Sequence, residues 1–317
     1  MKRWLRPAWQ VFSLALFALV LVLGGPEAWQ QIRSGTIEFI VIACLFFGVA
    51  SAVSAIRLQT VARATIQRRV ASFREFYHLN IVARAFGLIV PRSISTVGGK
   101  AVALRAMDVP FKRAVWIVLL DNAFDLGLLG VLALPALLFL RHQGPTWAFV
   151  VLALGPILAL GGSLWWLTSS GQLGFFTQRL ASIPRVASLL RIEVNGPINL
   201  RLSPSSALSA LALTVTLNGL LATCYYFIAR AVGLPHPWSA FAAGFPITQL
   251  SLALAVTPGG LGLVDAGWYG VLRLADVPHG DALAFVIAQR AYIFIFVLIW
   301  TGFGMLISLP GKSTPHA

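Results

Sequence analysis

The heptad LRAMDVP, residues 104–110, returns almost unchanged as LRLADVP, residues 272–278. Five of the seven positions are identical, and each identical pair is separated by 168 residues. Each heptad closes an apolar region that is broken at its centre, FGLIVPRSISTVGGKAVAL at 86–104 and FPITQLSLALAVTPGGLGLVDAGWYGVL at 245–272. An apolar segment of spanning length follows each heptad. The heptads therefore predict two related halves, each made of a broken hairpin and a helix.

The composition is that of an integral membrane protein. Hydrophobic residues make up 58% of the chain and charged residues 11%, and the mean hydropathy is +0.83. A soluble domain carries about 25% charged residues. The net charge of +14 does not indicate nucleic-acid binding, because the basic residues cluster between apolar segments. Cys44 and Cys224 lie inside apolar runs without metal-ligand spacing, so we expect neither a metal site nor a cofactor.

The apolar segments predict an all-α polytopic membrane protein with about six full spans, since a spanning helix needs about 20 residues. The candidates are residues 8–25, 36–56, 114–140, 146–167, 206–229 and 281–309. We interpret the first as a retained helix and not as a cleaved signal. Regions 76–107 and 238–275 are also apolar, but each has proline and paired glycine at its centre.

The basic residues predict the orientation. The positive-inside rule places both termini in the cytoplasm, in the expected setting of a bacterial inner membrane. A set of arginines follows the second span and is interpreted as a surface polybasic stretch without a specific ligand: Arg57, Arg63, Arg68, Arg69 and Arg74. Six spans return the chain to the cytoplasm, so each broken region must leave on the side it entered. This predicts two re-entrant hairpins, one from each side.

The flanks of the two heptads favour an inverted-topology repeat, a design that transporters use. DVPFKR is basic and DVPHGD is acidic, as opposite membrane sides would require. Chance similarity is the alternative, because Asp and Pro are common where helices begin. We expect one transmembrane domain over 1–317. Its predicted parts are two N-terminal helices in 1–75, a first repeat half in 76–167, a cytoplasmic basic loop in 168–205 and a second repeat half in 206–309.

Ionisable residues inside the apolar segments are the candidate site. Asp121 and Asp125 are four residues apart and share a helix face. They predict a proton- or cation-linked site or a counter-charge for a buried base, with a structural polar knot around Asn122 as the alternative. Arg290 has two readings of equal standing: it binds a lipid phosphate, or it neutralises Asp121, Asp125 or Asp265.

The cost of these charges predicts that they share one site. A charged residue at a helix centre costs about 2.5–3.5 kcal/mol on insertion scales. One polar cavity near the midplane would shelter all of them at the lowest cost. We therefore expect Asp121, Asp125, Asp265 and Arg290 to converge.

Two further stretches can contact a ligand. TPGGLGLVD, 257–265, places backbone N–H groups at a helix start, where an anion can bind; the alternative is a tight turn with glycines for close packing. Arg84, Arg92, Lys100 and Arg105 lie along the first broken region and can attract anionic headgroups, with snorkelling as the alternative for each. The scattered histidines and the lack of a GxSxG motif predict that the chain is not an enzyme and has no catalytic residue.

At these residues the chain resembles the lysylphosphatidylglycerol synthase transmembrane-region family, the flippase-like membrane domain, over about 75–309. The family's Pro-Gly-Gly-x-Gly-x-x-Glu segment matches 258–265, with Asp265 in place of Glu. Gly98-Gly99-Lys100 and Asp121-Asn122 also depart from the family's usual Gly-Glu and Glu-Arg. The resemblance and the spacing together give the expected substrate-binding residues: Arg92, Arg105, Asp121, Asp125, Pro258, Gly259, Gly260, Gly262, Asp265 and Arg290.

The resemblance implies lipid handling: a flippase-like transporter of an anionic or isoprenoid-type lipid. One alternative is a non-transporting lipid-binding subunit that supports a separate envelope-lipid or glycolipid synthesis enzyme, and another is a membrane-embedded glycosyltransferase accessory. The expected partner is a membrane lipid with an anionic headgroup or lipid phosphate, and no nucleic acid. Because the chain ends eight residues after Leu309, we expect no aminoacyl-transferase domain and no lysyl transfer.

Overall fold

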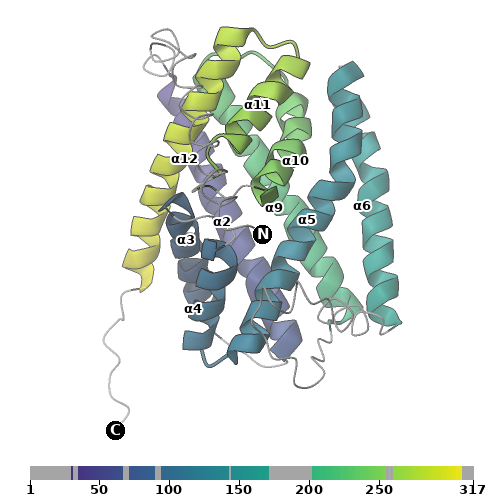
Figure 1. Cartoon of the computed structure of the whole chain (residues 1–317), viewed down its shortest axis with the longest axis vertical. Coiled ribbons are helices and arrows are strands. Elements are labelled where there is room, and N and C mark those ends of the chain that lie inside the picture. The colour runs from purple at the N-terminus through teal and green to yellow at the C-terminus, as the bar shows by residue number, and fades with distance from the viewer. Residues whose placement is uncertain are drawn as a thin grey trace, which may run out of the picture.

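The computed structural model describes residues 30, 35–66, 71–89, 94–142, 144–170, 202–254, 257 and 260–308. The predicted first span at 8–25, Pro91, Arg92, Pro258, Gly259 and most of the predicted basic loop lie outside these residues. Helices make up the described part, which contains no strand, and they form an elongated bundle (Figure 1). They are α2 (Ile37–Ile66), α3 (Phe73–Ile89), the π-helical segment η1 (Ile94–Gly99), α4 (Lys100–Ala106), α5 (Phe111–His142), α6 (Thr146–Ser169), α9 (Pro204–Ala231), α10 (Trp238–Leu254), α11 (Leu263–Leu274) and α12 (His279–Ser308).

Five of these helices, α2, α5, α6, α9 and α12, are long and apolar enough to cross a membrane. They confirm an all-α polytopic membrane protein and coincide with the predicted spans to within three residues at each end, except at one end of α2. That helix continues ten residues beyond the predicted end, to Ile66. The reason is that Leu58, Val61 and Ala62 keep one face of the added turns buried.

Short polar residues set several helix starts. Ser72 and Glu75 form a capping box at the start of α3, in which the Ser72 N–H donates to the Glu75 carboxylate at 2.6 Å. This hydrogen bond holds the pKa of Glu75 below its usual range. Ser203 caps α9 through the Ser206 N–H, and Pro204 occupies the first turn, where its missing N–H costs nothing.

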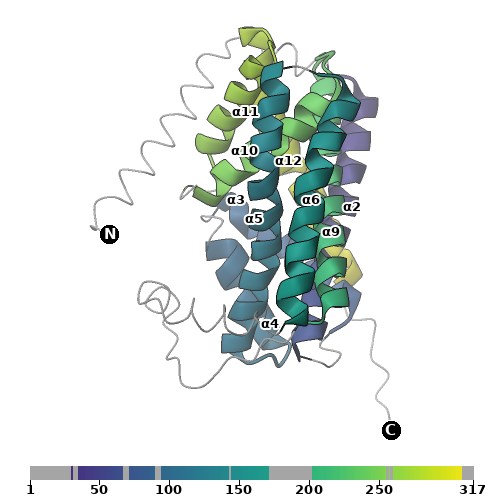
Figure 2. The same ribbon diagram turned by 90° about the vertical axis from the view of Figure 1, so that its right-hand side faces the viewer.

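Each broken apolar region forms a helical hairpin. The first consists of α3 followed by η1 and α4, and the second consists of α10 followed by α11. In both views the first hairpin lies at the lower end of the bundle and the second at the upper end (Figures 1 and 2). This arrangement is compatible with one hairpin entering from each membrane side, and their insertion in a bilayer stays a prediction.

Each hairpin packs against a spanning helix of the other half of the chain. The first hairpin packs through α3 against α12, and the second packs through α10 against α5. Each second arm also packs on the span that follows it, α4 on α5 and α11 on α12, while α2 and α9 pack along each other. The α3–α12 contact thus has its counterpart in α10–α5, and the α4–α5 contact has its counterpart in α11–α12. This reciprocal packing is the pattern expected of an inverted repeat.

The repeated heptads have the same backbone structure. Asp108 has φ 60° and Asp276 has φ 57°, and they are the non-glycine residues with positive φ in the described part of the chain. In each heptad the N–H of the valine after the aspartate donates to the C=O of the first leucine, at 3.2 and 3.0 Å. This six-to-one bond around a left-handed residue is a Schellman helix ending, and the following proline prevents the helix from continuing.

A third heptad, ARAVGLP at 229–235, ends in the same way. Gly233 has φ 81°, and the Leu234 N–H donates to the Ala229 C=O at 3.0 Å. This heptad ends α9, which is a span and not a hairpin arm. The heptad is therefore a helix-stop signal of this chain, and its recurrence alone does not indicate a repeat. The reciprocal packing of the hairpins is the observation that favours one.

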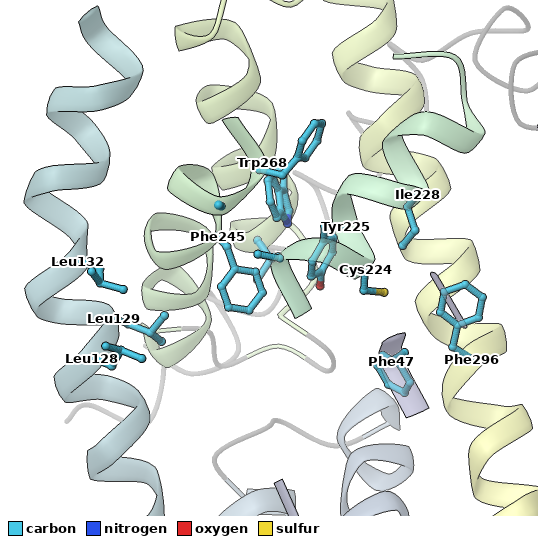
Figure 3. Close-up of a cluster of buried hydrophobic side chains, with 14 of the residues drawn as sticks. Phe47, Leu128, Leu129, Leu132, Cys224, Tyr225, Ile228, Phe245, Trp268 and Phe296 are labelled. Carbon is cyan, nitrogen blue, oxygen red and sulfur yellow. The ribbon is translucent and has the colours of Figure 1, made fainter. Parts of the chain in front are cut away.

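Aromatic rings fill the core beside the second hairpin (Figure 3). The Trp268 ring of α11 lies 4.9 Å from the Tyr225 ring of α9, which in turn lies 5.8 Å from the Phe245 ring of α10. Gly244 allows this approach, because a Cβ there would overlap the Val271 side chain. The two hairpin arms are thus packed closely against each other and against α9.

Candidate functional site

A first polar cluster surrounds Arg57 in the interior. The Arg57 Nε donates to Asp121 Oδ1 at 2.8 Å and Nη2 donates to Asp125 Oδ2 at 2.7 Å. Nη1 donates to the other oxygen of Asp125 and to the Thr214 hydroxyl. Arg57 is only 1% exposed, so its interpretation as part of a surface polybasic stretch is wrong. One prediction for Asp121 and Asp125 was that they are the counter-charge of a buried base, and Arg57 is that base.

Lys100 joins the same cluster from the first hairpin. Its Nζ lies 3.4 Å from Asp121 Oδ2, and its side chain is 7% exposed. The sequence predicted that Lys100 either contacts a headgroup or extends to the membrane interface. Both predictions are wrong, because its side chain is buried beside Asp121. Its long side chain turns inward because a carboxylate that is 0% exposed offers it a partner. The resulting ion pair connects α4 to α5.

A second polar cluster surrounds Asp265 at the start of α11. The Arg290 Nε donates to Asp265 Oδ1 at 2.6 Å, and Nη2 donates to Asp265 Oδ2 and to the Gly260 C=O, both at 3.1 Å. Gln289 donates to Asp265 Oδ1 at 3.2 Å, and the Gly262 N–H donates to Oδ2 at 2.8 Å. Of the three aspartates predicted as partners of Arg290, the structure thus brings Asp265 into contact.

The glycine loop before α11 serves as a tight turn. Gly260 has φ 68° and Gly262 has φ 83°, a region that side chains rarely adopt. The turn directs the Gly262 N–H toward the Asp265 carboxylate, which caps the helix. The chain's own Asp265 carboxylate thus occupies this helix start, and binding of a ligand anion there stays a prediction.

The acids predicted to share one cavity contact different bases, and their convergence in one cavity stays a prediction. Asp121 and Asp125 share Arg57, whereas Asp265 shares Arg290. Arg105 is exposed near the end of α4 and contributes to neither cluster through the contacts described above.

Four members of the clusters were not predicted as partners of these acids: Arg57, Lys100, Thr214 and Gln289. For Arg57 a signal was present. Two carboxylates on one face of an apolar helix require a base, and Arg57 is the first arginine after the second apolar segment. For Thr214 no comparable signal exists, because its bond to Arg57 depends on the packing of α9 along α2.

Matched positions in the two halves hold the hairpins. Asp121 lies 17 residues after Leu104, and Gln289 lies 17 residues after Leu272. Asp121 contacts Lys100 of the preceding hairpin arm, and Gln289 contacts Asp265 of its own preceding arm. Polar residues at the same depth of α5 and α12 therefore tie each span to the hairpin before it.

The two clusters present opposite charges. In the first, the exposed member is the acid Asp125, whose side chain is 27% exposed, while Arg57 is closed off. In the second, the exposed member is the base Arg290, at 21%, while Asp265 is 0% exposed. A guanidinium matches a phosphate or carboxylate with two parallel bonds, so the second cluster has the chemistry of an anion site. Within the described residues no group of His, Cys, Asp or Glu gathers as a metal site.

Comparison with known proteins gives a family. The model of the family described as the lysylphosphatidylglycerol synthase TM region matches residues 10–301, which is most of the chain. The matched region is a membrane region, in agreement with the spanning helices. A comparison with curated proteins gives no match. The chain is therefore a multi-pass membrane protein that belongs to the lysylphosphatidylglycerol synthase transmembrane-region family.

Proposed function

We propose that this protein binds a lipid with an anionic headgroup or an isoprenoid-type lipid phosphate and moves it across the membrane, without catalysing a reaction. Family membership relates it to membrane lipids. The observation that carries the proposal is Arg290, a partly exposed guanidinium near the middle of a spanning helix. A charge at that depth is a functional-site hypothesis by default.

The proposed site uses the position of Arg290 in α12. This residue lies 11 positions after His279, or roughly 17 Å along a helix of about 45 Å. A headgroup phosphate would meet the guanidinium there, and its tails would lie outside against apolar side chains. Such side chains follow Arg290 on α12 itself, where Phe294 is 50% and Leu298 is 53% exposed. We further propose the bacterial inner membrane, with both termini in the cytoplasm.

Lipid retained by the purified protein tests the binding step. The wild type, Arg290→Gln and Arg273→Gln would be purified in the same detergent, and their bound lipids measured by mass spectrometry. Arg273 is a suitable control because it is exposed and bonds the Val277 C=O at the end of α11. We expect the wild type and Arg273→Gln to retain phosphate-bearing lipid and Arg290→Gln to lose most of it. Equal retention by all three proteins would contradict the proposal.

A second candidate is a non-transporting lipid-binding subunit that supports a separate envelope-lipid synthesis enzyme. The observation that favours it is the Asp265–Arg290 ion pair, which a static scaffold would use to hold α11 on α12. A scaffold tolerates neutral replacement of this pair, whereas a transporter does not. Asp265→Asn combined with Arg290→Gln removes both charges, so full function of this double variant in the cell would favour the scaffold.

A further inference from the structure

Asp265 has hydrogen bonds that do not depend on Arg290. The Gly262 N–H donates to Oδ2 at 2.8 Å, and the Gln289 amide donates to Oδ1 at 3.2 Å. The start of α11 also favours a negative charge at this place, because the helix dipole is positive there. The carboxylate would therefore keep two donors and a favourable field if the guanidinium turned away.

Arg290 presents to Asp265 the edge that a phosphate would use. Nε and Nη2 contact the two carboxylate oxygens at 2.6 and 3.1 Å, which is the side-on geometry of a paired contact. Two oxygens of a phosphate have the same requirement. Arg290 is 21% exposed whereas Asp265 is 0% exposed, so an incoming anion reaches the base and not the acid. Arg57 has no such access at 1% exposure.

We propose that Asp265 is an internal competitor for the anionic ligand of Arg290, and that a phosphate group displaces it from the Nε–Nη2 edge. This inference rests on the proposed function and deepens it. The displaced carboxylate stays on Gly262 and Gln289, while α11 loses its ion pair with α12. Ligand binding is thereby coupled to the contact that holds the second hairpin on the last span.

Competition and a purely structural role predict opposite changes in ligand affinity for Asp265→Asn. An internal competitor lowers the apparent affinity by the fraction of time in which it leaves the site open. If Asp265 occupies Arg290 for about 90% of the time, its neutralisation tightens ligand binding about tenfold. An aspartate that only positions Arg290 gives the opposite result, because its replacement disorders the guanidinium and weakens binding.

The experiment compares the full-length wild type with Asp265→Asn, Arg290→Gln and Asp281→Asn, each titrated with phosphatidylglycerol in mixed micelles. Asp281 is the matched control, because the substitution and the change in net charge are the same and the residue lies in the first turn of α12. We expect Asp265→Asn to bind about tenfold more tightly, Asp281→Asn to bind as the wild type does, and Arg290→Gln to lose binding. Asp265→Asn binding no more tightly than the wild type overturns the inference.

Two further probes identify the source of the phosphate. Diacylglycerol lacks the phosphate and is expected not to bind with measurable preference, whereas glycerol 3-phosphate carries it without tails. Tightening for phosphatidylglycerol alone supports a lipid ligand, and equal tightening for glycerol 3-phosphate supports the same competition with a soluble phosphate compound. A wild type that binds phosphatidylglycerol no better than diacylglycerol, with no effect of Arg290→Gln, would reject the proposed function itself.

A measurement on the wild type covers the case in which Asp265→Asn does not fold. Hydrogen exchange of the first turn of α11, residues 263–266, would be followed with phosphatidylglycerol and with diacylglycerol. Displacement of Asp265 loosens the contact between α11 and α12, so phosphatidylglycerol is expected to speed exchange in this turn and diacylglycerol to leave it unchanged. Slower or unchanged exchange with phosphatidylglycerol overturns the inference.

Discussion

Arg57 of α2 and Asp125 of α5, 68 residues apart in the chain, form an end-on ion pair in which each terminal nitrogen donates to one carboxylate oxygen. The Arg57 side chain is 1% exposed, and its Nε donates to Asp121. Burying an arginine in an apolar bundle costs several kcal/mol, which two carboxylates offset only when the geometry is good. The pair therefore fixes how α2 and α5 face each other within the bundle.

Removing Arg57 alone should destabilise the protein strongly. In Arg57→Met, the two aspartates lose their shared guanidinium, and Lys100 remains as a base beside Asp121. Removing one partner of a buried ion pair costs about 3–5 kcal/mol. The melting temperature in detergent, followed by size-exclusion chromatography, measures the loss.

The double variant Arg57→Met with Asp125→Leu is the matched control. It removes one charge of each sign and retains the Lys100–Asp121 pair. It should recover most of the stability that the single variant loses, because a balanced apolar replacement of an ion pair is often neutral. An Arg57→Met protein as stable as the wild type would show that the cluster is not needed for the fold.

The sequence predicted the helices better than the partners of the charges. Apolar length alone located five spans, and the breaks in the two remaining apolar regions located the two helical hairpins. The partner of Asp121 was missed because a run of arginines normally marks the end of a span, while α2 continues past Arg57 to Ile66. Which base reaches which acid depends on how helices rotate and pack, and local sequence does not encode that. That Asp265 contacts Arg290 while Asp121 and Asp125 contact Arg57 could not be predicted for the same reason.

The left-handed aspartates of the heptads make a prediction about glycine. Alanine and glycine both remove the carboxylate of Asp108, but only glycine adopts φ 60° without a steric penalty. Asp108→Gly should therefore be more stable than Asp108→Ala by about 1–2 kcal/mol. The same order is expected at Asp276, where φ is 57°. Thermal melting of the four variants measures the differences, and equal stabilities of the Ala and Gly variants would contradict this account of the helix ending.

Gly48 makes a prediction about the packing of α2 against α12. A Cβ at this position would overlap the Trp300 ring, and the Trp300 Nε1 donates to the Cys44 C=O at 2.9 Å, which holds the ring in place. Gly48→Ala should destabilise the protein by about 1–3 kcal/mol, the usual cost of overpacking.

Gly219 provides the control for that substitution. It lies within α9, and a Cβ there would meet nothing within 4 Å. Gly219→Ala should be neutral or stabilising, because alanine is the better helix former. A Gly48→Ala variant that melts at or above the temperature of Gly219→Ala would show that the helices separate easily here.

The two ends of the bundle should face opposite sides of the membrane. Helix α5, with Lys112 in its first turn, begins at the lower end, and α12, whose first residue is His279, begins at the upper end (Figure 1). The positive-inside rule assigns the cytoplasm to the lower end, because the first turn of α5 carries Lys112 and Arg113. In a variant without Cys44 and Cys224, an impermeant maleimide should label His279→Cys on intact cells and Lys112→Cys only after permeabilisation. Labelling of both positions from the same side would refute the inverted orientation of the two halves.

The most direct test of the central claim is transbilayer movement of a fluorescent phosphatidylglycerol in liposomes that contain the purified protein. The wild type is expected to speed this movement well above protein-free liposomes, and Arg290→Gln is expected to abolish the gain. Arg290→Lys should lose most of it, because an ammonium cannot present the Nε–Nη2 edge that contacts Asp265. Thermal stability of each variant would separate loss of function from loss of folding. A folded Arg290→Gln protein that moves the lipid as fast as the wild type, or a wild type no faster than empty liposomes, would contradict the account.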